Sequence, residues 1–375
     1  MEERMTPRTL SRLAILTAIV VVIATWAVVR TPTVSAPDKQ GELMLGGLIN
    51  ELDDLKTVTV RHKEGKFTFD LDNGNWKFVD RGGYPVNADK MAELLITMAR
   101  LEKLEPKTKL ENRYQRLDLN DPSEKDSRAK HVTLLTDTNK KLADLIVGKR
   151  KFTLGSDEGG VYVRQPEDSQ TWLVRGELNP GNRPRDWLMR DITDIKDEDI
   201  RRVVVTQADG DVLAVSKESS GQKDFAVEKI PAGRELRRET IANDHGRVLS
   251  SLLLDDVTDD KTMAFPQDNV ITAVFEGWEG FAVTMWLAEV DGNNWVKVRG
   301  DLLTSIPEDV VSDEARPGLS AEASPTVKTN AKDWPAVIDE INTRSRGWIY
   351  QVPGYEISAL KRRMTEMLKE VDAGG

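Results

Sequence analysis

The sequence predicts an α+β protein in which an N-terminal transmembrane helix precedes two tandem, similarly organised units of antiparallel β-hairpins with amphipathic helices. Three observations lead to this prediction. The chain of 375 residues begins with a long apolar run. Alternating apolar residues then follow, separated by Asn-Gly and Asp-Gly turn signals, and this order of elements recurs in the second half.

The anchor is predicted at Leu13–Val29, roughly 17 residues without a charge, which is near the minimum for a helix that spans about 30 Å of hydrocarbon. Basic residues before the run place the N-terminus inside the cell and the chain from residue 31 outside it: Arg4, Arg8 and Arg12. One alternative is a signal peptide cleaved after Val34-Ser35-Ala36, and another is a buried or inverted segment.

Residues 1–30 are therefore expected to form a cytoplasmic tip and anchor, residues 31–41 a polar stalk, and residues 42–195 the first unit. In chain order we expect a helical face, a hairpin that turns at Asn73-Gly74, a helix capped by Asn87 or Asp89, and two more strand pairs. The apolar positions behind these expectations are Leu45, Leu48, Ile49, Leu52 and Leu55, Thr57–Val60, Phe67–Leu71, Trp76–Phe78, Met91–Leu101, His131–Val147, Val161–Val163 and Trp172–Val174.

Residues 196–372 are predicted to form the second unit, with a mobile insertion at about 306–332 that is rich in Pro, Ser, Ala and acidic residues. The turn at Asp291–Asn294 delivers Trp295 onto a strand, as Asn73-Gly74 delivers Trp76 in the first unit. The expected elements are a strand at Asp199–Val205, a hairpin to Phe225 and Val227, a helix through Ile241, Val248, Leu252 and Leu253, strands at Val270–Phe275, Phe281–Leu287 and Trp295–Val298, and a final helix through Ile357, Leu360, Met364, Met367 and Leu368.

The composition excludes several classes of function. A formal net charge of -10 disfavours a protein that binds nucleic acid, because such proteins carry basic patches. The chain has no cysteine, which removes disulfides, thiolate catalysis and lipid-modified cysteine. No phosphate-binding loop, dinucleotide fingerprint or nucleophile elbow is present. We therefore predict no catalytic, cofactor-binding or metal-binding residues.

Several residue groups are candidates for functional sites, and each has a structural explanation that we favour. The histidines His62, His131 and His245 stand far apart in sequence, and Asp70–Asn75 resembles a calcium loop but lacks its acid at position 12, where Arg81 stands. Close acid pairs suit solvated helix ends better than glycoside chemistry: Asp255-Asp256 and Asp259-Asp260. The aromatic residues suit core packing better than a carbohydrate platform: Trp172, Trp187, Trp295, Trp348, Tyr162 and Tyr350. The arginines suit a solvated loop better than an anion site: Arg183, Arg185 and Arg190.

A series of segments in order resembles a known family. They are Trp76–Phe78, Gly82–Val86, Asn87–Asp89, Leu104–Thr108, Tyr114–Leu119, Leu145–Arg150, Val161–Arg164, Trp172–Val174, Arg185–Leu188, Ile341–Arg344 and Gly347–Pro353. This order is similar to the domain-of-unknown-function family numbered 4340. The resemblance implies an N-terminal membrane helix, an exported domain, and a gene beside ABC transporters of the gliding-motility type. It supplies no catalytic residues.

These observations together lead us to expect a non-catalytic protein held in the inner (cytoplasmic) membrane, with most of the chain on the extracytoplasmic side. It would serve as an accessory or scaffold of an ABC-type transporter, so its expected partners are the membrane and the transporter subunits or another envelope protein. A module that binds a glycan or peptide is the alternative. A hydrolase that uses a pair of carboxylates is the third hypothesis.

Overall fold

Two large antiparallel sheets, a separate two-stranded ladder and a few helices make up the described part of the chain, so it is mainly β with α+β character. The computed structural model describes residues 41–152, 159–303 and 332–370. The predicted anchor, the stalk up to residue 40 and nearly all of the predicted insertion at 306–332 lie outside these ranges. Of the helices that are described, none has both the length and the apolar character needed to cross a membrane.

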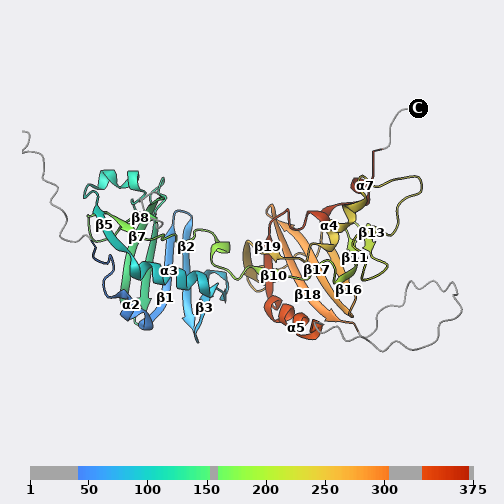
Figure 1. Ribbon diagram of the computed structural model, residues 1–375, viewed down its shortest axis with the longest axis horizontal. Coiled ribbons are helices and arrows are strands. Elements are labelled where there is room, and N and C mark those ends of the chain that lie inside the picture. Colours follow the sequence, from blue (N-terminus) through green and yellow to red (C-terminus); the bar gives the residue numbers. More distant parts are fainter. Residues whose placement is uncertain (1–40, 153–158, 304–331, 371–375) are drawn as a thin grey trace, which may run out of the picture.

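The first sheet has nine strands in the order β4-β3-β2-β1-β6-β7-β8-β9-β5, and every neighbouring pair is antiparallel. Figure 1 shows it on the left, with α3 lying over β1–β3. Its strands are β1 (Leu55–His62), β2 (Gly65–Asp72), β3 (Asn75–Phe78), β4 (Tyr84–Pro85), β5 (Glu102–Pro106), β6 (Lys130–Thr136), β7 (Lys141–Lys151), β8 (Gly160–Arg164) and β9 (Trp172–Arg175). Its helices are α2 (Leu48–Glu51), α3 (Ala88–Arg100) and the 3-10 turns η1 (Leu52–Asp54), η2 (Val79–Arg81), η3 (Glu111–Leu117) and η4 (Pro184–Asp186).

Local signals set the hairpins and the cap of α3. Asn73 and Gly74 have positive φ angles of 49° and 79°, the backbone conformation that a tight turn between β2 and β3 requires. The hairpin expected at Asp70–Asn75 is thus confirmed. Asn87 caps α3, since its side chain accepts a hydrogen bond from the backbone N–H of Lys90 at 3.1 Å.

The helical face predicted from Leu45 to Leu55 is wrong at both ends. The helix begins only at Leu48, because Gly47 precedes it in the left-handed region with φ 88°. Leu55 already belongs to β1, where the β-branched residues that follow it pair with β2 and β6. Seven helical residues remain, split between α2 and η1.

The second sheet has eight strands in the order β13-β12-β11-β16-β17-β18-β19-β15. The two large sheets share one strand order. If β1–β3 are matched to β11–β13 and β5–β9 to β15–β19, each strand has the corresponding neighbours in both sheets, and β4 alone has no counterpart among the described strands. β10 and β14 form a separate two-stranded ladder, in which β10 lies in the connection between the two sheets and β14 lies between β13 and β15 in the chain. The strands are β10 (Asp191–Thr193), β11 (Ile200–Thr206), β12 (Val212–Ser216), β13 (Ala226–Val227), β14 (Leu252–Leu253), β15 (Asp256–Asp259), β16 (Ile271–Gly277), β17 (Phe281–Val290), β18 (Asn293–Leu302) and β19 (Trp348–Val352).

The helices of the second half differ most from the prediction. The expected helix from Ile241 to Leu253 is reduced to η5 (Glu239–Ala242) and α4 (Asn243–Gly246), and Leu252 and Leu253 instead pair with β10. The final helix is two short ones, α6 (Ser358–Lys361) and α7 (Met364–Met367). The helix α5 (Trp334–Ser345) was not predicted, although Asp333 caps it by accepting from the backbone N–H of Ala336 at 3.2 Å.

One apolar core runs through both sheets, and a second, smaller core lies on the other face of the first sheet. The smaller core is covered by residues 107–129, the connection from β5 to β6, which we call the flap. Tyr114 and Leu119 of the flap pack there against Ile146 and Tyr162 of the sheet. The flap fits closely: a Cβ on Gly148 of β7 would lie 2.3 Å from the carbonyl oxygen of Leu117.

Candidate functional site

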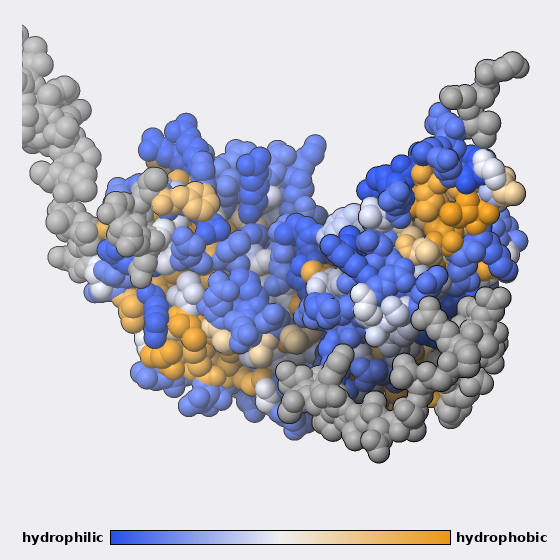
Figure 2. Space-filling view, turned by 45° about the vertical axis from the view of Figure 1, so that its right-hand side comes forward, coloured by the Kyte–Doolittle hydropathy of each residue, from blue (hydrophilic) through white to orange (hydrophobic). Residues whose placement is uncertain are grey.

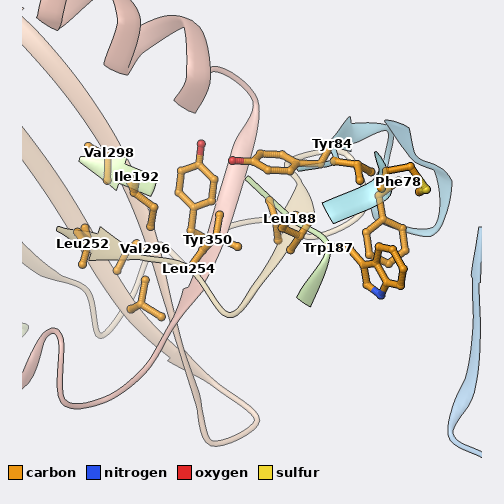
Figure 3. Packing of buried hydrophobic residues seen from close by; sticks show 14 of the residues in the cluster. Phe78, Tyr84, Trp187, Leu188, Ile192, Leu252, Leu254, Val296, Val298 and Tyr350 are labelled. Carbon is orange, nitrogen blue, oxygen red and sulfur yellow. The ribbon is translucent and has the colours of Figure 1, made fainter. Parts of the chain in front are cut away.

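The junction between the sheets is where the two halves of the chain make their long-range contacts. Tyr84 of the first sheet is buried and meets Trp348 and Tyr350 of β19 edge to face, with ring centroids 5.0 and 6.1 Å apart. Its hydroxyl donates to the carbonyl oxygen of Met189 at 3.2 Å. Figure 3 shows Tyr84 reaching towards Tyr350, with Leu188 beside them. Burial raises the pKa of both tyrosines, so they remain neutral donors.

Ion pairs border this aromatic contact. The guanidinium of Arg81 binds both carboxylate oxygens of Asp256, at 2.5 and 2.9 Å. Asp255 accepts from Arg185 at 3.0 Å and lies 3.5 Å from Arg190. A bidentate, partly buried pair holds its geometry better than an exposed one. The junction therefore combines an apolar centre with charged borders.

Two sequence interpretations are corrected by these pairs. Asp255 and Asp256 are not solvated helix ends: Asp256 begins edge strand β15, Asp255 precedes it, and both are ion-paired across the junction. The arginines around Trp187 are not simply solvated either. Arg185 binds Asp255 and is joined there by Arg190, while Arg183 pairs with Asp186 in its own turn at 3.1 Å.

The three histidines do not form a site together. His131 lies opposite Arg61 in the register of β6 and β1, so His62 projects to the other face of the sheet, and His245 lies on α4 of the second half. In the described ranges, no group of three or more His, Cys, Asp or Glu residues is arranged to hold a metal ion.

His131 belongs to a polar network that the sequence did not indicate. Its Nε2 contacts Asp144 and its Nδ1 lies 3.1 Å from a guanidinium nitrogen of Arg61. Asp144 also accepts from Thr133 at 3.0 Å and from Lys141 at 2.6 Å. Burial opposes ionisation of Asp144, but the bonds from Lys141 and His131 outweigh it and lower its pKa. Both ring nitrogens of His131 are engaged, so this network suits cross-strand stabilisation better than proton transfer.

A pocket of about 520 Å³ opens between the flap and the turn from β8 to β9. Arg164 forms part of its wall, and the residue as a whole is only 9% exposed. Five carboxylate side chains line the same pocket: Glu111, Asp121, Glu124, Glu167 and Asp168. The sequence contained no spacing signal for this site, because its walls come from three separate segments.

The aromatic residues do not form one platform. Trp187 and Tyr350 are fully buried and Trp172 is nearly so, which confirms core packing for these three. Trp295, Trp348 and Tyr162 are half-buried, and of these Trp348 packs on Tyr84 at the junction while Tyr162 packs against the core under the flap.

Comparison with protein families gives one match, to the model described as domain of unknown function (DUF4340), over residues 76–268. The chain belongs to the DUF4340 family. The comparisons with curated proteins and with solved structures gave no match.

The DUF4340 match covers both sides of the junction. It begins in β3, just before Arg81 and Tyr84, and ends beyond β15, which carries Asp256. The aromatic partners Trp348 and Tyr350 on β19 lie beyond its end. The family model therefore includes the charged half of this DUF4340 junction and all of the residues that line the pocket under the flap.

Proposed function

We propose that this DUF4340 protein is a non-catalytic, membrane-anchored envelope protein that works as an accessory or scaffold of an ABC-type transporter. The observation that carries the proposal is the single apolar core that continues from one sheet into the other through the junction. A continuous core of this kind opposes hinge motion between the halves, which suits a spacer of fixed shape. The predicted anchor at Leu13–Val29 would hold this spacer at the outer face of the inner membrane.

We also infer that the two sheets are copies of one structural unit. Beyond their common strand order, equivalent hydrogen bonds close each unit. The N–H of Asn87 donates to the carbonyl of Trp187 at 2.7 Å, and the N–H of Arg237 donates to that of Met367 at 2.8 Å. The side chain of Tyr84 donates to the carbonyl of Met189, and that of Arg234 donates to the carbonyl of Lys369 at 2.7 Å. Repeated units joined end to end suit a structural role.

The surface gives limited support to the alternative of an aromatic glycan platform. Figure 2 shows a largely hydrophilic face with separate apolar areas on the two halves. Trp295 is half-buried on β18, and it is the remaining candidate for such a platform because Trp172 is buried and Trp348 packs on Tyr84. The hydrolase hypothesis finds less support, since the junction acids Asp255 and Asp256 are engaged by arginines.

Co-purification tests the scaffold proposal. The full chain, tagged at its C-terminus, would be extracted from membranes in a mild detergent after brief amine crosslinking, and its partners identified by mass spectrometry. Recovery of ABC transporter subunits with the full chain is the expected result. Full-chain preparations that contain no transporter subunit would contradict the proposal.

A chain that lacks residues 1–30 provides the matched control, because it removes the predicted anchor and leaves both sheets intact. We expect it to be soluble, to give a β-rich circular dichroism spectrum, and to recover transporter subunits poorly. A truncated chain that supports transport as well as the full chain would show that the anchor has no part in the function.

A further inference from the structure

The pocket under the flap contains a buried charge that lacks a carboxylate partner. Nε of Arg164 donates to the carbonyl of Leu119 at 2.8 Å, and Nη1 donates to that of Pro166 at 3.3 Å. The guanidinium also lies 4.7 Å from the ring of Tyr114, whose hydroxyl donates to the carbonyl of Ser169 at 2.7 Å. Within the described ranges, no carboxylate oxygen comes within 4.0 Å of Arg164.

This arrangement holds the guanidinium in place and leaves part of its hydrogen-bonding capacity unused. The two carbonyls and the tyrosine ring fix the plane of Arg164, while Nη2 has no hydrogen bond to a described residue. Nη2 is also not among the polar atoms that are sealed from solvent without a partner, so it remains accessible to solvent, and Arg164 is one of the residues that line the pocket. A buried charge is generally paired, and a guanidinium fork matches a carboxylate in both shape and charge.

The second sheet offers an internal comparison. The two sheets can be aligned by their strand registers, with Trp172 at the start of β9 matched to Trp348 at the start of β19. In this alignment Arg164 of β8 corresponds to Arg299 of β18. Arg299 is exposed and binds Asp301, two residues further on, at 3.1 Å. The residue two positions after Arg164 is Pro166, which offers only its carbonyl. The same strand position is therefore neutralised in one sheet and left with a free charge in the other.

The rest of the pocket wall is acidic, which restricts the ligand. Burial raises the pKa of Tyr114 against the opposing charge of Arg164, and the negative charges of Glu111 and Asp168 act in the same direction as burial. Asp121 stays ionised, since hydrogen bonds from Ser123 and the charge of Arg61 lower its pKa in spite of partial burial. A simple anion would be repelled by these acids, so a ligand for Arg164 needs a positive charge as well.

We propose that this pocket binds a short peptide as a zwitterion, with its C-terminal carboxylate on Arg164 and its ammonium group among the acidic side chains. The volume of about 520 Å³ lies within the range of small-ligand sites. The site is independent of the scaffold role, because its walls belong to the first half of the chain and lie away from the junction residues.

Calorimetric titration of the full chain in detergent with alanyl-alanine, its C-terminal amide and its N-acetyl derivative tests the proposal. We expect saturable binding of the free dipeptide, and binding about tenfold weaker or worse for each blocked form, because each has lost one charge-assisted contact. Arg164→Gln should abolish binding of the free dipeptide. The matched control Arg299→Gln should leave it unchanged.

A second variant covers the possibility that Arg164→Gln disturbs the flap. Glu111 and Glu167 are exposed, so their joint replacement by Gln should leave the melting temperature unchanged. This variant should weaken the free dipeptide several-fold and leave the affinity of the N-acetyl form as it was. Absence of binding by all three peptides, or equal binding of the amide and the free dipeptide, would overturn the proposal.

Discussion

Replacement of Tyr84 tests whether the junction holds the two sheets together. Tyr84 is 1% exposed, and an aromatic side chain of this kind removes about 150–250 Å² from water. At about 25 cal/mol per Å² this burial is worth roughly 4–6 kcal/mol as an upper bound. Truncations of buried aromatic residues cost about 3–5 kcal/mol. We therefore expect Tyr84→Ala to lower the free energy of unfolding by about 3–5 kcal/mol.

Tyr84→Phe separates the hydroxyl from the ring. It keeps the edge-to-face contacts with Trp348 and Tyr350 and removes the donor to Met189, so it should cost about 1 kcal/mol. Urea denaturation of the chain from residue 31 onward, followed by tryptophan fluorescence, measures both values. Tyr355→Ala is the matched control, since Tyr355 is 73% exposed. A cost below about 1 kcal/mol for Tyr84→Ala, or one equal to that of Tyr355→Ala, would refute the assignment of Tyr84 to the junction core.

Two further predictions concern the flap and the second half. A Cβ on Gly148 would lie 2.3 and 2.7 Å from the carbonyl oxygens of Leu117 and Asp118, so Gly148→Ala should lower the free energy of unfolding, measured with heat or urea, by about 1–3 kcal/mol. The control Gly221→Ala, whose Cβ would meet no atom within 4 Å, should cost less than about 1 kcal/mol. Burial, together with the charge of Arg362, lowers the pKa of His245 from 6.5 to about 4, so the unfolded chain binds this proton more readily than the folded one. The stability contributed by neutral His245 should be complete above about pH 6.5 and fall by roughly 3 kcal/mol as the pH drops towards 4. Urea unfolding across this range should therefore show a loss of stability that is smaller by about this amount in His245→Gln, while the part that comes from carboxylates such as Asp144 remains.

Features whose cause lies within a few residues could be predicted from the sequence. The Asn73-Gly74 turn and the Asn87 cap depend on the intrinsic backbone and hydrogen-bonding preferences of those residues, and both occur where expected. The helical pattern from Ile241 to Leu253 is also local, but pairing with β10 takes Leu252 and Leu253 into a strand. Tertiary contacts thus overrode a weak helical preference.

Features whose partners lie far along the chain could not be predicted. Arg81 and Asp256 are 175 residues apart, and only the meeting of two sheet edges brings their charges together. Asp255 and Asp256 resembled solvated acids because the sequence places no arginine close to them. The pocket could not be predicted either, because its walls come from the flap, from β8 and from the turn after β8.

The strand order that the two sheets share provides information that the sequence of either half lacks. Each half has an arginine on the strand that precedes its β9 or β19, and neither arginine is unusual by itself. Strand order and register align the two positions, so the two arginines can be compared directly. Arg299 binds a carboxylate, whereas Arg164 binds backbone carbonyls. If the two sheets served only as a structural spacer, nothing would favour leaving a largely buried arginine without a carboxylate partner in one of them, since a buried charge without a counter-charge is destabilising. The asymmetry between equivalent positions is therefore the strongest structural reason to seek a ligand under the flap as well as a partner for the whole chain.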